Sequence, residues 1–426
     1  QNPNAVPNTV SGFPTSGNGQ VPVATITNSG TNPYTLTYTI TPTANGCNGA
    51  TGNYTITVNP APTVTFSQGN QTVCNGGNSQ QVTINSTTAN TTFSWSVQNP
   101  LPNGLGAVLP ASGNTATIPA YNGLTNNTSQ PISFTISASA STSGNAVCPG
   151  APLNYTITVN PTAIASASFV SNDTICNNTQ VSITLSSTTP NVQFTWTVSA
   201  PNGVSGAAPS GAASASIQQT LTNANASIAL VTYTVTPQLG NCNGTVLAVP
   251  VYVNPVAVMA AMNNLTSCPG QQITPPAFGS VPTPSTFAWS NSNTAVGLNA
   301  AGSNNIPSWN APVNNGVANI TSTVTVTPTY NGCVGTPSNF TVTIYPTPSI
   351  TTSPMNQTVC EGVATSAITF TSNLAGSTFA WNYGTAGANL SGFNNGNGSN
   401  PLPSMTIAHA GNSPQTVTYS VVPTSA

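Results

Sequence analysis

One pattern returns four times along the chain and constrains its fold more than any other feature of the sequence. A cysteine is followed 20 or 21 residues later by a tryptophan, and a phenylalanine stands two positions before each tryptophan. The four sets are Cys74, Phe93 and Trp95; Cys176, Phe194 and Trp196; Cys268, Phe287 and Trp289; and Cys360, Phe379 and Trp381. Self-similarity at a nearly fixed period is the signature of a repeat architecture, so the chain is predicted to be a tandem array.

A second set of landmarks closes each repeat. A stretch that ends in proline, such as "TYTITP" at 37–42, precedes a turn with a cysteine and then a stretch such as "YTITVNP" at 54–60 and 155–161. The cysteines of these turns are Cys47, Cys148, Cys242 and Cys333. The closing prolines mark the unit boundaries, since proline cannot donate to a sheet ladder. We number five units and place them at 1–60, 61–161, 162–255, 256–346 and 347–426.

The repeated stretches predict β-strands. "YTITV", "VTYTVTP" and "FTWTV" alternate apolar and polar residues with a period of two, and Gly, Asn and Pro between such stretches supply turns. Repeats of about 90–100 residues with short strands match a two-sheet antiparallel sandwich with a central tryptophan. The predicted fold is therefore all-β, a tandem array of immunoglobulin-like sandwiches that forms an elongated rod.

The first and last units lack parts of the repeat. Unit 1 has no Cys/Phe-x-Trp segment, and unit 5 stops at "TYSVVPTSA", before its cysteine turn and last strand. We therefore expect the sequence to be a window on a longer chain. A sharper hypothesis is that a strand of a neighbouring molecule completes unit 5, as in donor-strand fibres.

These residues resemble a known family, the PKD-like and Ig-like repeats of large secreted surface proteins in Bacteroidota. The resemblance rests on "TVCNG", "FSWSV", "YTITPTANGCNG" and "YTITVNPAPTV", and it covers essentially all 426 residues. It implies export by a type IX secretion route and service in adhesins, including gliding-motility adhesins. Any contact with surface glycans is expected from regions outside this window.

The composition excludes several classes of partner. The chain has no Lys or Arg, two acidic residues and one His. A surface without cations has no electrostatic footprint for nucleic acid and nothing to attract it to an anionic membrane. No apolar run approaches the ~20 residues of a membrane helix. Because little charge repulsion keeps molecules apart, we expect an extracellular protein whose partners include neighbouring copies, laterally or end to end.

The eight cysteines are predicted to form structural disulfides, because two per unit in a secreted chain is typical of them. A zinc site is disfavoured by the lack of a CxxC pair. We favour pairing within each unit, which gives Cys74–Cys148, Cys176–Cys242 and Cys268–Cys333 and leaves Cys47 and Cys360 with partners beyond the ends. Sandwich geometry favours an alternative, a staple between neighbouring units such as Cys74–Cys242 and Cys176–Cys333. Sequential pairing, beginning with Cys47–Cys74, is a third possibility.

Residues for catalysis are scarce. His409 is the single imidazole, and the two carboxylates, Asp173 and Glu361, belong to other units. A nucleophile–base pair or a glycosidase carboxylate pair would need these groups side by side, which a rod does not allow. Two carboxylates also fall short of the oxygen ligands that a calcium junction requires. We therefore predict no enzyme activity, no cofactor and no metal.

The aromatic residues are assigned to the core. The Phe-x-Trp spacing puts both rings of each pair on one strand face, so core packing is favoured over sugar-stacking platforms. Trp309 falls outside the pattern and is the aromatic residue to examine for exposure. Thr174 lies in "DTI", a short match to the Bacteroidota O-glycosylation pattern, and is a candidate modification site.

The sequence thus predicts a non-catalytic stalk or filament segment of a giant extracellular adhesin, in which each unit adds length. Two competing hypotheses remain. One is a self-assembling extracellular fibre subunit, joined by strand exchange or lateral bundling, and the other is a glycan-binding module.

Overall fold

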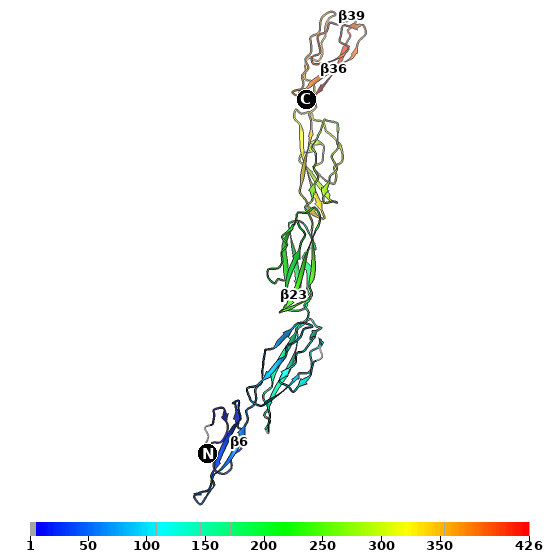
Figure 1. The fold of residues 1–426 in the computed structure, drawn as a ribbon. Helices are drawn as coiled ribbons and strands as arrows, with labels where there is room; N and C mark the ends of the chain where they lie inside the picture. The colour runs from blue at the N-terminus through cyan, green and yellow to red at the C-terminus, as the bar shows by residue number, and fades with distance from the viewer. Residues whose placement is uncertain (1–5, 107–108, 145, 171, 353, 426) are drawn as a thin grey trace.

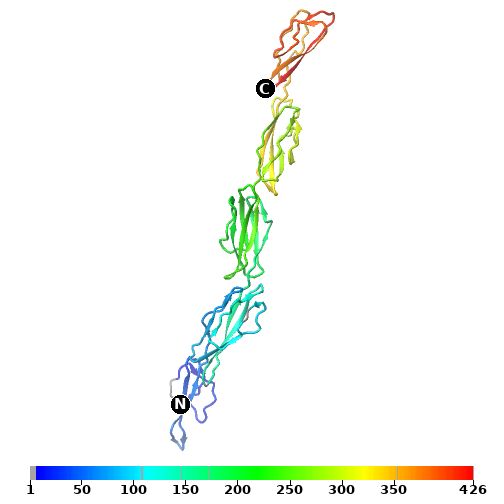
Figure 2. The ribbon, with the colours of Figure 1, turned by 45° about the vertical axis from the view of Figure 1, so that its right-hand side comes forward.

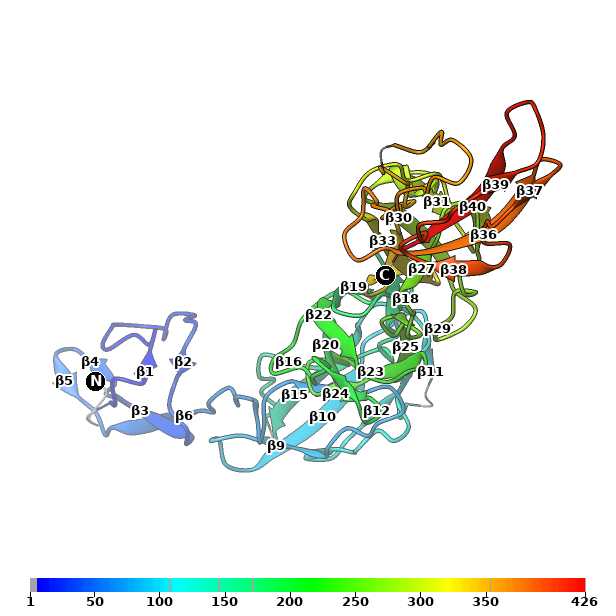
Figure 3. The same ribbon diagram turned by 90° about the horizontal axis from the view of Figure 1, so that it is seen from above.

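The computed structural model describes residues 6–106, 109–144, 146–170, 172–352 and 354–425. Five small bodies follow one another in a row (Figures 1 and 2), and the chain passes through them in order. Seen from above, unit 1 lies to one side of the others (Figure 3), so the row is not straight. The predicted all-β tandem array is confirmed. Among the described residues the single helical element is one turn of 3-10 helix, η1 (Thr294–Val296).

Unit 2 is a complete sandwich. Its larger sheet has the order β12-β10-β15-β16-β8 and faces a smaller sheet of order β13-β9-β7. The sheets are antiparallel except at one edge, where β8 runs parallel to β16. The strands are β7 (Thr65–Phe66), β8 (Gln71–Val73), β9 (Val82–Asn85), β10 (Thr91–Val97), β11 (Leu105–Gly106), β12 (Ser112–Gly113), β13 (Thr117–Ile118), β14 (Thr125–Asn126), β15 (Ile132–Thr142) and β16 (Leu153–Val159).

Unit 3 repeats this plan. A sheet of order β18-β25-β23-β20 faces one of order β17-β19-β22-β21, and β24 pairs with the end of β23. The parallel edge pair is now β18 and β25. The strands are β17 (Ser166–Phe169), β18 (Thr174–Ile175), β19 (Thr179–Ser186), β20 (Gln193–Ser199), β21 (Val204–Ser205), β22 (Ser216–Asn223), β23 (Ala229–Leu239), β24 (Cys242–Asn243) and β25 (Leu247–Val253).

Unit 4 keeps the larger sheet, of order β27-β35-β33-β30-β31 with β34 paired to β33. Two short strand pairs, β26 with β29 and β28 with β32, accompany η1 in place of a second full sheet. The strands are β26 (Val258–Met259), β27 (Leu265–Ser267), β28 (Gln272–Ile273), β29 (Ser280–Val281), β30 (Thr286–Asn291), β31 (Ala301–Ser303), β32 (Trp309–Asn310), β33 (Ile320–Tyr330), β34 (Cys333–Val334) and β35 (Ser338–Ile344).

Units 1 and 5 contain fewer strands in their described parts. Unit 1 pairs β1 (Val10–Ser11) with β2 (Thr27–Asn28), β3 (Tyr34–Ile40) with β6 (Gly52–Val58), and β4 (Thr43–Ala44) with β5 (Cys47–Asn48). Unit 5 has a sheet of order β38-β36-β40 and a separate pair of β37 with β39. Its strands are β36 (Thr378–Ala386), β37 (Leu390–Ser391), β38 (Asn397–Ser399), β39 (Ala408–His409) and β40 (Val417–Thr424).

Each core cluster lies within one predicted unit, and the clusters differ in size. The clusters of units 2, 3 and 4 contain 16, 15 and 12 buried residues, whereas those of units 5 and 1 contain four and three. Burying one large apolar side chain contributes about 1.5–3 kcal/mol. Units 2 to 4 are therefore the well-stabilised part of the row.

The repeated tryptophans are buried, with exposed fractions of 3–8% for Trp95, Trp196, Trp289 and Trp381. In three units a glycine on the neighbouring strand lies against the indole, and an added Cβ would fall 2.3–2.5 Å from the ring. These glycines are Gly113, Gly302 and Gly398. The phenylalanines two positions earlier are buried or half-buried, so the Phe-x-Trp pairs line the core and offer no open stacking platform.

Candidate functional site

The chemically distinctive places in this chain are the junctions between units. At the end of unit 3, Ile175 lies opposite Val253 in the parallel pair of β18 and β25. The backbone N–H of Asn254 donates to the carbonyl of Ile175 over 2.9 Å. Cys176 therefore lies at the end of unit 3 that faces unit 4.

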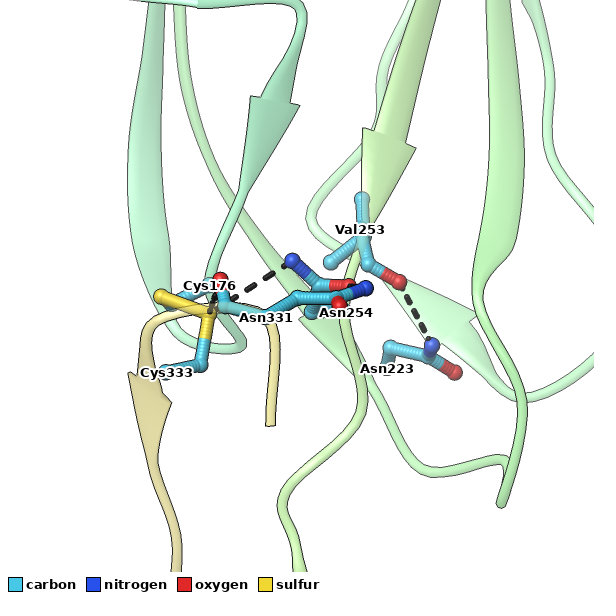
Figure 4. The surroundings of a disulfide bond; sticks show 6 residues. All are labelled: Cys176, Asn223, Val253, Asn254, Asn331 and Cys333. Atoms are coloured by element: carbon cyan, nitrogen blue, oxygen red, sulfur yellow. Dashed lines mark hydrogen bonds between the residues drawn. A yellow bond between two sulfur atoms is a disulfide. The ribbon is translucent and has the colours of Figure 1, made fainter. Parts of the chain in front are cut away.

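The second half of this junction is a hairpin of unit 4, formed by β33 and β34. The N–H of Thr336 donates to the carbonyl of Ala257, in the linker between the units, over 2.9 Å. Gly335 permits this approach, because a Cβ there would lie 2.2 Å from the same carbonyl oxygen. The hairpin thereby brings Cys333 beside Cys176, and the two form a disulfide with a Cα–Cα distance of 5.5 Å (Figure 4).

The junction between units 2 and 3 has the same construction. Cys74 and Cys242 form a disulfide with a Cα–Cα distance of 5.4 Å. The N–H of Thr245 donates to the linker carbonyl of Ala163 over 3.0 Å, and a Cβ on Gly244 would lie 2.0 Å from that oxygen. We call this arrangement the staple: an early cysteine of one unit bonded to the hairpin cysteine of the next, with a Cys-x-Gly hairpin docked on the linker.

The favoured prediction of pairing within each unit is wrong, and so is sequential pairing. The alternative considered from sandwich geometry is the one observed, with the same two pairs. The two cysteines of one unit lie at opposite ends of long strands. An 11-residue strand such as β23 spans about 36 Å at ~3.3 Å per residue, whereas a disulfide tolerates ~4.4–6.8 Å between Cα atoms.

The other four cysteines, Cys47, Cys148, Cys268 and Cys360, are free thiols in the structure. This corrects the predicted bonds of Cys148 and Cys268, whereas Cys47 and Cys360 were expected to have no partner within this sequence. These cysteines are free because of their places in the order of units. Cys47 and Cys148 are hairpin cysteines whose preceding unit offers no early cysteine in this sequence. Cys268 and Cys360 are early cysteines, and this sequence does not include the hairpin cysteine of a following unit. Each is one half of a staple.

Asparagines surround the staples, and the sequence analysis missed them. The Nδ2 of Asn254 donates to Cys333 Sγ over 3.5 Å, and Asn331 Nδ2 donates to Asn254 Oδ1 (Figure 4). Asn160 occupies the same place at the preceding junction, 3.7 Å from Cys242 Sγ. The available signal was the Asn-Pro pair that ends "VNP" at 159–161 and 253–255.

A second asparagine fixes the last strand of units 1 to 4. Asn223 Nδ2 donates to the carbonyl of Val253, at the end of β25, over 2.8 Å (Figure 4), while Asn223 Oδ1 accepts from the N–H of Asn225. Asn28, Asn126 and Asn314 bind the ends of β6, β16 and β35 in the same way. We call this residue the clamp asparagine. It holds the strand that leads into the junction.

The remaining residues singled out from the sequence lie apart from one another. Trp309 is half-buried, packs against the core of unit 4 and donates its indole N–H to the carbonyl of Val296 over 2.8 Å. Asp173 and Glu361 are exposed, and His409 is half-buried. Thr174 is exposed at a sheet edge, where its glycosylation stays a prediction. Within the described ranges no group of three metal-ligating side chains comes together.

The sequence matches the model of one protein family. The model described as the PKD-like domain matches residues 3–62, 71–163 and 173–257, together more than half of the sequence. The chain belongs to the PKD-like domain family. A search of curated proteins returned no match.

Solved structures with some similarity include the protocadherin GammaB4 extracellular domain, at 13% identity, with 92% of this chain and 72% of that chain covered and a TM-score of 0.24. Mouse cadherin-23 EC22-24 has 10% identity, 67% and 99% coverage and a TM-score of 0.27. Sidekick-1 immunoglobulin domains 1-5 have 12% identity, 82% and 83% coverage and a TM-score of 0.23. Scores this low carry no argument about function.

The family and the staples together support a coarse statement of function. Tandem PKD-like domains are consistent with an extracellular structural or adhesion-related module, and such domains are typically non-catalytic. Disulfides persist in oxidising compartments, which fits a secreted or extracellular protein. In the part of the chain that the structure describes, no helix has the length and apolarity to cross a membrane.

Proposed function

We propose that this chain is a non-catalytic, load-bearing stalk segment of an extracellular adhesin that holds a binding tip away from the cell surface. The observation that carries the proposal is the staple, which joins consecutive units covalently at their shared ends. A linker of a few residues alone would leave neighbouring units free to swing. A disulfide, a docked hairpin and a linker hydrogen bond restrict that motion between units 2 and 3 and between units 3 and 4.

The two staples also overlap along the chain, which matters under tension. One closes a loop of 168 residues and the other a loop of 157, and both loops contain residues 176–242. A pull on the two ends is therefore carried from Cys74 across to Cys242, back through unit 3 to Cys176, and across to Cys333. This path shields most of units 2 and 4 from extension even when their cores unfold.

The experiment is single-molecule stretching of the chain before and after reduction. Between Cys74 and Cys333 the direct chain has about 260 residues, while the stapled path has about 65; at ~3.5 Å per residue, reduction adds about 680 Å of extension. Equal extensions under both conditions would contradict the load-bearing role of the staples. The double variant Cys74→Ser with Cys176→Ser is the matched control, since it should show the long extension without reductant.

The secretion route, the Bacteroidota origin and a role in gliding motility belong to this proposal and rest on the sequence resemblance. A cell-surface location is supported by the family match and the disulfides. Electron microscopy of native material tests it: single beaded strings emerging from cells support a stalk.

A further inference from the structure

Unit 3 differs from units 2 and 4 on the outer face of its larger sheet. In units 2 and 4 the outward-facing residues of the last two long strands, β15 and β16 or β33 and β35, are all Ser, Thr or Asn. In unit 3 four of these positions on β23 and β25 are apolar or aromatic instead: Leu230, Ala248, Pro250 and Tyr252. One unit of the three therefore presents an apolar patch where the others present hydroxyl groups.

The strand ladders show that the same place is being compared. In each unit the second pair from one end of the ladder joins the two long strands on the outer face. These pairs are Leu230 with Tyr252 in unit 3, Ser133 with Thr158 in unit 2, and Thr321 with Thr343 in unit 4. Leu230 is 46% exposed and Tyr252 is 38% exposed. An exposed apolar cluster with a polar rim is typical of a binding surface.

A carboxylate lies at the rim of this patch. Thr174 of the edge strand β18 lies opposite Tyr252, and the N–H of Tyr252 donates to the carbonyl of Asp173 over 2.7 Å. The hydroxyl of Thr174 donates to Asp173 Oδ1 over 3.1 Å, and both side chains are exposed. Asp173 is one of only two acidic residues in the chain. We call Asp173, Thr174, Leu230, Pro250 and Tyr252 the Tyr252 face.

The chemistry of the Tyr252 face specifies its ligand. An exposed carboxylate accepts hydrogen bonds and has none to donate, so it selects a ligand with O–H or N–H donors. An anionic ligand would be repelled by Asp173 and would find no Lys or Arg in the chain. The ring of Tyr252, with Leu230 beside it, selects a flat apolar surface. A neutral pyranose sugar has both properties, since its C–H face is apolar and its hydroxyl groups are donors.

A second copy of the chain is a poorer occupant of this face. Protein covering the Tyr252 face would bury Asp173, and a copy has no Lys or Arg side chain to pair with the carboxylate. Burying an unpaired charge is costly. A saccharide lies flat on the face and leaves the outer edge of the carboxylate in water. From Leu230 to Thr174 the row crosses three strands, about 10 Å, which suits one or two sugar rings.

We propose that the Tyr252 face of unit 3 binds a neutral saccharide. The ring of Tyr252 packs against the C–H face of a pyranose, Leu230 and Pro250 extend the apolar contact, and Asp173 accepts hydrogen bonds from the sugar hydroxyls. This goes beyond the stalk role, because a unit of the stalk itself holds a ligand, whereas glycan contacts were expected from regions outside this sequence.

The staple keeps this surface in place. Cys176, two residues after Thr174, is bonded to Cys333 of unit 4, and the carbonyl of Ile175 accepts from the N–H of Asn254. The edge strand is thus fixed on both sides of Thr174. A ligand that binds a fixed surface loses less free energy to ordering than one that binds a mobile loop.

The test uses the full 426-residue chain with both staples formed and four neutral probes: cellohexaose, maltohexaose, mannohexaose and chitohexaose. Saturation-transfer NMR should show contact with the C–H protons of at least one probe, and titration gives its Kd. Tyr252→Thr installs the residue that unit 4 has at this position and should weaken binding about tenfold or more. Thr343→Ala, at the matching position of unit 4, should leave the Kd unchanged. Contact with none of the four probes, or equal binding by Tyr252→Thr and the wild type, would overturn the proposal.

The role of the carboxylate separates a sugar from other partners. Asp173→Asn should weaken sugar binding about fivefold, and the wild-type Kd should not change between about 50 and 500 mM salt, because the ligand is uncharged. A lysine decapeptide is the comparison probe. Peptide binding that needs Asp173 and is lost at high salt, with no sugar contact, would assign the face to a basic protein. Self-association in sedimentation that disappears in Tyr252→Thr would assign it to a second copy, and either result contradicts the proposal.

Discussion

The junction between units 3 and 4 and the junction between units 4 and 5 join similar sandwiches in different ways. At the first, the hairpin with Cys333 docks on the linker and bonds Cys176. At the second, Cys268 is an exposed thiol, and a groove of about 440 Å³ remains beside Pro346, Leu374 and Ser425. The core of unit 4 has 12 buried residues and that of unit 5 has four. In unit 4 the hairpin carries the staple cysteine Cys333, and the strand that follows it, β35, contributes Phe340, Val342 and Ile344 to the core.

Breaking the staple should make the first junction resemble the second. The double variant Cys176→Ser with Cys333→Ser removes a 157-residue loop closure and should lower the free energy of unfolding by about 2–4 kcal/mol. Chemical denaturation followed by tryptophan fluorescence measures the change. Cys268→Ser makes the same chemical substitution at a free thiol and should have no effect on stability. A similar loss in both variants would mean that the bond itself contributes little.

The hairpin can be displaced without touching the sulfurs. Gly335→Ala puts a Cβ against the linker carbonyl of Ala257, so the hairpin must shift, at a cost of about 1–3 kcal/mol. Slower reoxidation of Cys176 with Cys333 after reduction, followed by thiol trapping, is the expected signature. Gly279→Ala, where the nearest atom is 3.7 Å from the added Cβ, is the control in the same unit. If both variants reoxidise at the wild-type rate, the close approach is not what positions the thiol.

The sequence predicted the sandwich directly, whereas it gave the observed junction only as the second-ranked disulfide pairing, and the reason is physical. Strand alternation and the Phe-x-Trp spacing indicate which face of a strand is buried. This is a local property, and each of the four repeats indicates it independently. Sandwich geometry puts the two cysteines of a unit at opposite ends and gave the observed pairs as an alternative, but the sequence does not show how neighbouring units meet, and two cysteines per unit were taken to favour closure within the unit. The assumption that a unit with two cysteines closes on itself was therefore reasonable but wrong for Cys74 and Cys176.

The clamp asparagines were missed for a different reason. Asparagine is common in this sequence, so Asn126, Asn223 and Asn314 do not stand out by type. Their signal is positional, since each lies six residues before the first residue of a long strand, at β15, β23 and β33. His409 lies opposite Leu390 as the clamp asparagine Asn126 lies opposite Leu105. It was assigned no role because a histidine was considered for catalysis and not as the counterpart of an asparagine.

The clamp position can be compared between unit 3, where Asn223 donates to the carbonyl of Val253, and unit 5, where His409 Nε2 has no acceptor among the described residues. Asn223→Ala leaves the carbonyl of Val253 without its buried donor and should cost unit 3 about 1–3 kcal/mol. In unit 5, where the described residues give His409 Nε2 no acceptor, His409→Ala should change the stability of the monomer by no more than about 0.5 kcal/mol. Hydrogen exchange read for each unit separately measures both values. A large loss on His409→Ala in the monomer would show that the side chain already has a structural role there.

Alkaline pH should lower the stability of unit 3 more than that of unit 4, and this effect should be smaller than those of the substitutions above. Burial raises the pKa of Tyr233 to about 12 from the usual 10, whereas the core cluster of unit 4 contains no tyrosine and has Val324 at this position. A group whose pKa is higher in the folded state stabilises the fold fully below pH 10, and this contribution is lost as the pH rises from 10 to 12. Unit 3 should therefore lose hydrogen-exchange protection over this range before unit 4 does. Tyr233→Phe removes the titrating hydroxyl, together with its hydrogen bond to Gln219, and should abolish the difference between the two units. If the variant keeps the wild-type pH dependence, another group causes the effect.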